Sequence, residues 1–176
     1  MDTTQTSTDS LVPGSECVLL ACHETLQSLC NLESQPIDCP AQDPVGGVVI
    51  ALVSLVGDRE WSIFLGLPQD TAEKMATKFA GFPIPYASPD MGDAVGEMTN
   101  IMAGNLKRLL DQRGVKVEIS LPNVLRGEGL CLLHKNSVSV QKKCFQSPLG
   151  LFWTGFLADT QAAGAHWPGF SQPVKS

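Results

Sequence analysis

The sequence lacks an excess of basic residues, and it lacks a long apolar run. Its 176 residues include 12 Lys and Arg against 18 Asp and Glu, for a formal net charge of −6. Because proteins that bind nucleic acids carry basic surfaces that neutralise phosphates, we expect no nucleic-acid binding. The longest apolar run, residues 46–57, is roughly half of the ~20 residues that a membrane-spanning helix needs. We therefore expect no membrane contact and interpret this run as a buried strand.

Cysteine and histidine motifs are also missing. The six cysteines form no CxxC pair, which is the spacing typical of zinc sites and redox centres. The three histidines lie far apart in the sequence, at His23, His134 and His166. We therefore predict no metal site and expect no cofactor bound by this chain. The cysteines are interpreted as buried free thiols, and Cys22 and Cys30 fall on the apolar side of the first predicted helix.

What the chain does contain is the composition of a folded globular protein. Hydrophobic residues make up 43% and charged residues 17% of the chain, which is enough apolar content for one domain with a sizeable core. We predict a flexible N-terminal segment at residues 1–14, a single domain over residues 15–160 and a C-terminal tail at residues 161–176. The N-terminus lacks the basic start and apolar middle of a signal peptide, so we expect a soluble, cytoplasmic protein.

Hydrophobic periodicity predicts three helices and several strands. The helices are expected at residues 15–31, within 67–81, and at 89–113. The strands are expected at residues 48–56, 61–67, 115–122, 131–144 with a break near 135–136, and 149–157, with loops at 33–45 and 123–129. Because short links join successive strands, we expect mainly antiparallel pairing. The predicted fold class is α+β, a mainly antiparallel sheet packed with a long helix and two shorter helices on one or both faces.

Capping signals mark the ends of these helices. Asp70 and Glu73 resemble a capping box that opens the second helix, and Gly81 ends it. Ser88 is the expected N-cap of the long helix, because a proline follows it at the first helical position. Gly114 stands just past the predicted end of that helix, where a glycine is favoured.

The long helix carries two stripes on nearly opposite sides. The apolar stripe consists of Met91, Val95, Met98, Met102, Leu106 and Leu109. The polar stripe consists of Asp93, Glu97, Asn100, Gly104, Lys107 and Asp111. Burial of the apolar stripe therefore turns Glu97 and Asn100 outward together, one turn apart. Asn105 projects towards the boundary of the apolar stripe, and we interpret it as a structural hydrogen-bonding residue.

Three glycines lie on or beside the polar stripe, at Gly92, Gly96 and Gly104. Each glycine inside a helix costs about 1 kcal/mol relative to alanine, so their presence on an exposed side needs a reason. One interpretation is a smooth surface on which the backbone of another protein settles. The other is a solvated surface that happens to be rich in glycine.

The motif on this helix resembles that of a known family. Asp93, Glu97 and Asn100 follow the spacing Asp-x3-Glu-x2-Asn, and Pro122 comes after a further 21 residues. This pattern resembles the signature of the CheC/CheX/FliY chemotaxis phosphatases. The first helix has only a partial copy, because Gln27 stands where a second motif would have Asn. A single motif makes the chain similar to CheX rather than to CheC, which carries two.

The resemblance implies a CheC-like fold and a phosphatase that acts on the aspartyl phosphate of a CheY-like response regulator. It implies that Asn100 positions the attacking water and that Glu97 pairs with a lysine of the partner. Asp93, Gly96 and Gly104 are then partner-binding residues. The partner supplies Mg²⁺, Pro122 shapes the end of a strand, and the protein is a homodimer. The chemistry suits these residue types, because the leaving group is a weakly basic carboxylate and positioning a water is most of the work.

Two other functions fit the same residues. The first is a binding module that recognises a receiver domain or a component of the flagellar switch without turnover. The second is a homodimeric scaffold that works through an unpaired sheet edge. The presence of both Glu97 and Asn100 favours catalysis over these alternatives.

Overall fold

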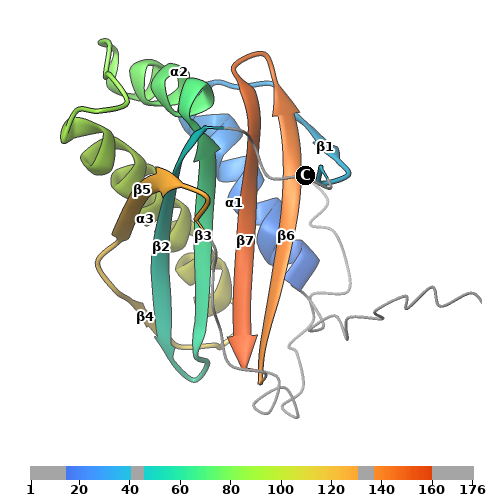
Figure 1. Cartoon of the computed structure of the whole chain (residues 1–176). Helices are drawn as coiled ribbons and strands as arrows, with labels where there is room; N and C mark the ends of the chain where they lie inside the picture. Colours follow the sequence, from blue (N-terminus) through green and yellow to red (C-terminus); the bar gives the residue numbers. More distant parts are fainter. Residues whose placement is uncertain (1–14, 41–45, 131–136, 160–176) are drawn as a thin grey trace, which may run out of the picture.

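A computed structural model of the chain describes residues 15–40, 46–130 and 137–159 (Figure 1). The expectations for residues 1–14 and 161–176, and for the strand-like stretch 131–136, lie outside these described residues. The helices are α1 (Ser15–Cys30), α2 (Gln69–Ala80) and α3 (Asp90–Asp111). The strands are β1 (Gln35–Ile37), β2 (Gly47–Gly57), β3 (Trp61–Pro68), β4 (Val117–Ile119), β5 (Asn123–Glu128), β6 (Val138–Ser147) and β7 (Gly150–Asp159). The predicted α+β class is confirmed.

The seven strands form one antiparallel sheet in the order β1-β6-β7-β3-β2-β4. Strand β5 also pairs with β2, at residues 47–52, whereas β4 pairs with residues 55–57. All three helices lie on one face of this sheet, as Figure 1 shows. Helix α1 packs on β6 and β7, while α3 packs on β2, β4 and β5. The long helix α3 therefore packs on the side of the sheet formed by β2, β4 and β5.

Strand residues alternate between two apolar clusters on opposite faces of the sheet. Val49, Ala51, Val53 and Leu55 of β2 are fully buried against the helices. The opposite face holds a smaller cluster around Val48, Phe64, Cys144 and Trp153. There the Trp153 side chain lies against Gly66 and the Phe64 ring lies against Gly155, and neither glycine has room for a Cβ. These glycines allow large aromatic side chains to lie close to the sheet, on the face opposite the three described helices.

The second helix begins differently from the prediction. The residue before it is Pro68, and no side chain caps its first turn, so the capping box predicted at Asp70 and Glu73 is wrong. Glu73 instead accepts a hydrogen bond from the backbone N–H of Tyr86, at 2.7 Å, in the connection to α3. The predicted end is confirmed, because Gly81 follows with a φ of 81°.

Two segments predicted as loops contain strands. Residues 33–45 include β1, and residues 123–129 include β5, which pairs along β2 from Leu52 to Gly47. Every residue of β1 is exposed, and β5 has mostly exposed residues, so neither shows the alternation of a half-buried strand. These two strands form because they pair with the edge of another strand that is distant in sequence, and a local residue pattern does not reveal such a partner.

The interpretation of all cysteines as free thiols is wrong for one pair. Cys39, just after β1, forms a disulfide with Cys144 of β6, and their Cα atoms are 5.1 Å apart. A separation of 105 residues leaves no local motif that would predict it. The interpretation is confirmed for Cys22 and Cys30, which are buried and free. Burial raises the pKa of the Cys22 thiol to about 12. The side chain of Cys17 and the residue Cys131 lie outside what the structure describes.

His23 of α1 is a buried imidazole. Its ring stacks on Phe145 with centroids 3.9 Å apart, and its Nε2 is 2.6 Å from the Ser34 hydroxyl. Burial, and then the positive charge of Lys143, lower the pKa of His23 to about 4. The folded protein therefore keeps this ring neutral at a pH where an unfolded chain protonates it.

This difference predicts a loss of stability in mild acid. Above the ordinary histidine pKa of about 6.5 both states are neutral at His23, and the residue contributes no pH dependence. Between that value and about 4 only the unfolded state binds the proton, so the free energy of unfolding falls as the pH falls. The replacement His23→Phe should reduce this slope by up to about 1.4 kcal/mol per pH unit. Urea unfolding from pH 7.5 to 4.5 measures it, and equal slopes for both proteins would contradict the prediction.

Candidate functional site

Helix α3, Asp90–Asp111, lies inside the predicted range 89–113, one residue shorter at its start and two at its end. Pro89 already has helical φ and ψ angles of −56° and −35°. Ser88 therefore stands at the N-cap, and its hydroxyl accepts a hydrogen bond from the backbone N–H of Asp90 at 3.2 Å. At the other end Gly114 has a φ of 78°, and its N–H donates to the Asp111 carbonyl at 3.0 Å. Both ends of the helix are thus closed by local hydrogen bonds, which holds its surface residues in a defined register.

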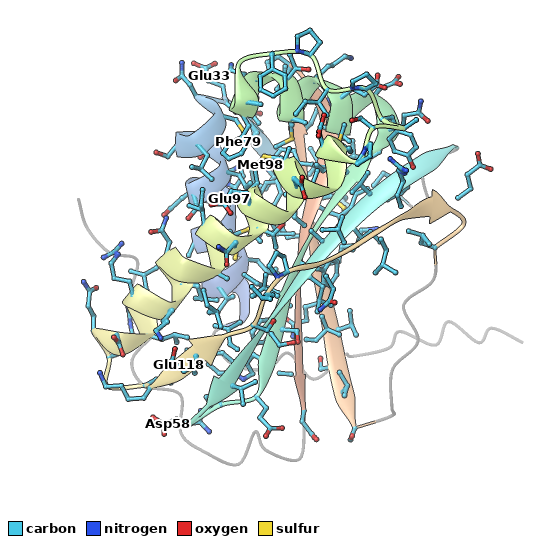
Figure 2. All side chains as sticks on the ribbon, turned by 90° about the vertical axis from the view of Figure 1, so that its left-hand side faces the viewer. Glu33, Asp58, Phe79, Glu97, Met98 and Glu118 are labelled. Carbon is cyan, nitrogen blue, oxygen red and sulfur yellow. A yellow bond between two sulfur atoms is a disulfide. The ribbon has the colours of Figure 1, made fainter. Side chains whose placement is uncertain are left out.

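The apolar stripe of α3 is buried against the sheet and the other two helices (Figure 2). Met91, Val95, Met98, Met102 and Leu106 are each 1% exposed or less. Leu109 is only partly buried, and Leu110 occupies the core in its place. Because this side is packed, the opposite side of the helix must face outward.

The N-terminal half of the polar stripe forms an open surface. Glu97 and Asp93 are exposed, and Asn100 and Gly104 are partly exposed. Figure 2 shows α3 in front of the sheet, with Glu97 labelled on it. Within the described residues, no hydrogen bond or ion pair engages the side chains of Asp93, Glu97 or Asn100. The acid and the amide that the sequence singles out therefore lie together on one surface, available to a partner.

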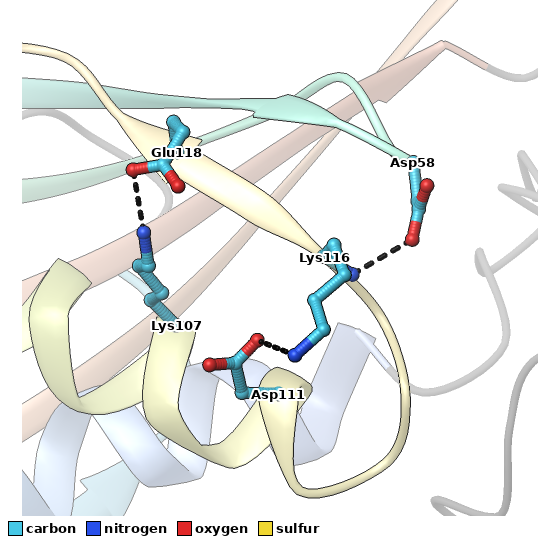
Figure 3. A network of polar contacts seen from close by, with 5 residues as sticks. All are labelled: Asp58, Lys107, Asp111, Lys116 and Glu118. Atoms are coloured by element: carbon cyan, nitrogen blue, oxygen red, sulfur yellow. Dashed lines mark hydrogen bonds and ion pairs between the residues drawn. The ribbon is translucent and has the colours of Figure 1, made fainter.

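The C-terminal half of the same stripe is already occupied (Figure 3). Lys107 pairs with Glu118 of β4 at 2.5 Å, and Asp111 pairs with Lys116 at 2.9 Å. The backbone N–H of Lys116 donates to the Asp58 carboxylate, at 2.7 Å, in the turn between β2 and β3. Exposed ion pairs add little stability, but they neutralise the charges of this half. The candidate site is therefore limited to the part of α3 from Asp93 to Gly104.

Gly96 and Pro122 meet where β5 crosses the helix. A Cβ at Gly96 would lie 3.3 Å from Val124 and 3.4 Å from the Pro122 ring. Gly96 is buried, so the expectation that it lies on an open, smooth surface is wrong. Its role in the fold is to let β5 approach the helix closely. Gly104 differs, because nothing lies within 4 Å of a Cβ there. Pro122 does not end the strand predicted at 115–122, because β4 ends at Ile119 and Pro122 immediately precedes β5.

Sequence reasoning missed the residue that fastens the start of α3. Arg126 of β5 donates hydrogen bonds from Nη1 to the carbonyls of Tyr86 at 2.5 Å and Ser88 at 3.1 Å. Its guanidinium also lies over the Tyr86 ring, 5.6 Å from the centroid, and the Tyr86 hydroxyl donates to the Val48 carbonyl at 3.3 Å. These contacts join segments about 40 residues apart, so no local signal could have identified them. They position the helix that carries Glu97 and Asn100.

The other side of α3 packs on α1. Asn105 donates a hydrogen bond from Nδ2 to the Thr25 hydroxyl at 3.3 Å, which confirms its predicted structural role. In α1, the side-chain amide of Gln27 donates to the Ser34 carbonyl at 3.2 Å. The partial motif on α1 therefore serves the local structure, and α3 carries the single complete motif.

The side chains at this surface, a carboxamide and carboxylates, suit hydrogen bonding and charge pairing with a partner. The described residues contain no group of three His, Cys, Asp or Glu side chains that could hold a metal ion. A carboxamide such as that of Asn100 accepts a hydrogen bond through its oxygen and donates two through its nitrogen, and it brings no charge. Glu97 adds a carboxylate that no cation among the described residues pairs with. Among the described helices, none is both long and apolar enough to cross a membrane.

Comparison with known proteins gives one family and a consistent set of folds. The profile of the family described as chemotaxis phosphatase CheX matches residues 49–145, more than half of the chain. Among solved structures, the chemotaxis protein CheX from Vibrio vulnificus is similar with a TM-score of 0.68 at 23% identity, over 81% of this chain and 97% of that one. CheX from Desulfovibrio desulfuricans gives 0.68 and 23%, over 83% and 99%.

A third structure contains a partner. It is a complex of CheX with CheY, BeF3 and Mg²⁺ from Borrelia burgdorferi, and it is similar to this chain with a TM-score of 0.64 at 24% identity, over 84% of this chain and 97% of that one. No curated protein sequence gives a significant match. At these identities the solved structures establish the fold, while the family profile establishes the relationship.

The two glycines of α3 should respond differently to alanine. At Gly104 an added methyl group meets open space, so Gly104→Ala should raise the free energy of unfolding by about 1 kcal/mol through helix propensity. At Gly96 the same gain is opposed by crowding against Val124 and Pro122, so Gly96→Ala should not exceed the wild type. Urea unfolding of both variants tests this. Equal stabilisation by the two substitutions would show that β5 does not rest on Gly96.

Proposed function

The chain belongs to the CheX family of chemotaxis phosphatases, and from this premise we propose that it hydrolyses the aspartyl phosphate of a CheY-like response regulator. The observation that carries the proposal is that the exposed Glu97 and the partly exposed Asn100 have no partner within the described residues. Both project from a helix whose ends are capped and whose apolar side is packed. The CheX–CheY complex of a structural neighbour supports a receiver of this type as the partner.

Asn100 is the water-positioning residue of the proposed reaction. Its carbonyl oxygen accepts a hydrogen bond from the attacking water and its NH2 group donates towards the phosphate oxygens. Since the amide is neutral, it enters an anionic site without charge repulsion. An acyl phosphate needs little further help, because its leaving group is a carboxylate, and placement of the water in line with phosphorus supplies most of the catalysis.

Glu97 docks the partner through an ion pair. Response regulators keep a lysine beside the phosphorylated aspartate, and the free carboxylate of Glu97 matches it in charge. Without that lysine, a carboxylate would repel the phosphoryl group. Asp93 lies one turn before Glu97 on the same exposed surface and extends the acidic contact. In this proposal the partner supplies Mg²⁺, because a receiver's own acidic residues lie at the phosphorylation site.

Two properties of the whole protein belong to the same proposal. We expect a homodimer in solution, and we expect it in the cytoplasm, where response regulators work. A reducing cytoplasm keeps most thiols reduced. The Cys39–Cys144 bond is therefore expected as a dithiol in the growing cell and as a disulfide in the purified, oxidised protein. The function does not depend on which form is present, because both cysteines lie at β1 and β6, away from α3.

Phosphate release from a phosphorylated CheY receiver domain tests the proposal. The wild type should accelerate release in catalytic amounts. Asn100→Ala should lower kcat by about 100-fold or more while the receiver still binds, because only the positioned water is lost. Glu97→Ala should weaken binding and turnover together, because the receiver's lysine is left unpaired.

Matched controls separate these expected losses from a general effect of removing an exposed carboxylate or amide. Glu24→Ala removes an exposed carboxylate on α1, and Gln112→Ala removes an exposed amide just past the end of α3. Both should behave as the wild type. If the wild type binds the receiver but never accelerates phosphate loss, the chain is a binding module and the phosphatase proposal is wrong.

A further inference from the structure

The chain contains a β-bulge directly beside the candidate site. Strands β4 and β5 both pair with β2, Ile119 opposite Leu55 and Asn123 opposite Leu52. Between these pairs, three residues of one strand (120–122) stand opposite two residues of the other (53–54). Such an extra residue bends a strand and redirects its side chains, and bulges are frequent next to active sites.

The bulge is required by the core. Ile119 and Val124 both pack into the cluster under the helices, although they are five residues apart. In an unbroken strand an odd separation places two side chains on opposite faces, so one of them would face solvent. The extra residue corrects this alternation and returns Val124 to the helix side. Its position in the sequence is therefore determined by packing, independently of any partner.

Hydrogen bonds fix the backbone of the bulge. The N–H of Ser120 donates to the Ser54 carbonyl at 2.9 Å, and the N–H of Ser54 donates to the Ser120 hydroxyl oxygen at 3.0 Å. That hydroxyl in turn donates to the carbonyl of Leu121 at 2.9 Å. Pro122 follows, with its ring against Gly96 of α3. Leu121 is thus held between a hydrogen-bonded serine and a packed proline.

Leu121 nevertheless projects into solvent. It is 86% exposed, whereas the other exposed large apolar residues of the described chain are between 36% and 56% exposed. Its main chain runs beside α3, because Glu118 pairs with Lys107 and Pro122 meets Gly96. Leu121 lies between these two contacts, alongside the part of the helix that carries Asn100 and the open surface at Gly104.

We propose that Leu121 is the apolar anchor of the receiver-binding surface and helps to select which receivers are dephosphorylated. This rests on the proposed function of Glu97 and Asn100. Those two residues supply charge and hydrogen bonds but little apolar area, and specific interfaces combine a polar site with a buried apolar contact. Because the bulge already fixes the backbone at Leu121, binding orders only the side chain and costs little backbone entropy. The matching feature of the partner is an apolar depression on the receiver surface next to its phosphorylated pocket.

The test measures binding and turnover separately. The full-length protein is titrated with a CheY receiver domain that carries beryllofluoride and Mg²⁺, and phosphate release is followed with the phosphorylated receiver. Leu121→Ser should raise Kd and KM roughly tenfold or more, as expected for a leucine side chain buried on binding, and leave kcat unchanged. Leu121→Met should restore most of the affinity. The melting temperature should not change, since the side chain makes no core contact.

Leu125→Ser is the matched control. Leu125 is 55% exposed in the same segment, but it pairs opposite Ile50 on the sheet face away from α3. It should bind the receiver as the wild type does. The anchor is refuted if Leu121→Ser binds normally, or if it changes the sedimentation of the free protein instead, since a second copy then occupies this position. If the wild type itself neither binds nor dephosphorylates the receiver while its fold is intact, the proposed function fails and the anchor with it.

Discussion

The packing of one side of α3 is the constraint on which the site depends. Five apolar residues of this helix are almost completely removed from water against the sheet, α1 and α2. Glu97 and Asn100 lie on the opposite side of the helix from these apolar residues, so the packing turns both side chains outward. The local caps at Ser88 and Gly114 keep the register, and Arg126 holds the connection that leads into the helix. Glu97 and Asn100 are thereby presented on the surface without hydrogen bonds to other side chains of the described chain.

The surrounding structure divides the exposed side of α3 into a committed part and an open part. Lys107 and Asp111 are paired with residues of β4 and of the segment leading into it, while the three polar residues of the N-terminal half have no partner in the described chain. Gly96 and Gly104 of α3 also differ in their surroundings. Side chains at the start of β5 occupy the space beside Gly96, whereas the space beside Gly104 is open. A small bulge between β4 and β5 then adds the exposed Leu121 to this open part. Charge, hydrogen-bonding capacity and apolar area therefore occur together at one place.

The two faces of the sheet are packed differently. One face is covered by helices and needs a continuous set of aliphatic residues, as β2 shows. None of the described helices covers the other face, and two aromatic side chains there contact glycines of the neighbouring strands, Trp153 at Gly66 and Phe64 at Gly155. Glycine here serves close approach rather than a turn. The disulfide between Cys39 and Cys144 adds a covalent link where β1 is only three residues long.

Local sequence patterns determined the three helices, the β2–β3 hairpin, the ends of α3 and the outward position of Glu97 and Asn100. These features depend on periodicity and on residues within a few positions of one another, which is information that a short window contains. Tertiary structure alone decided that residues 123–128 pair as β5, that Gly96 is buried and that Cys39 meets Cys144. Each of these requires two segments distant in sequence to meet, and nothing in either segment by itself specifies its partner.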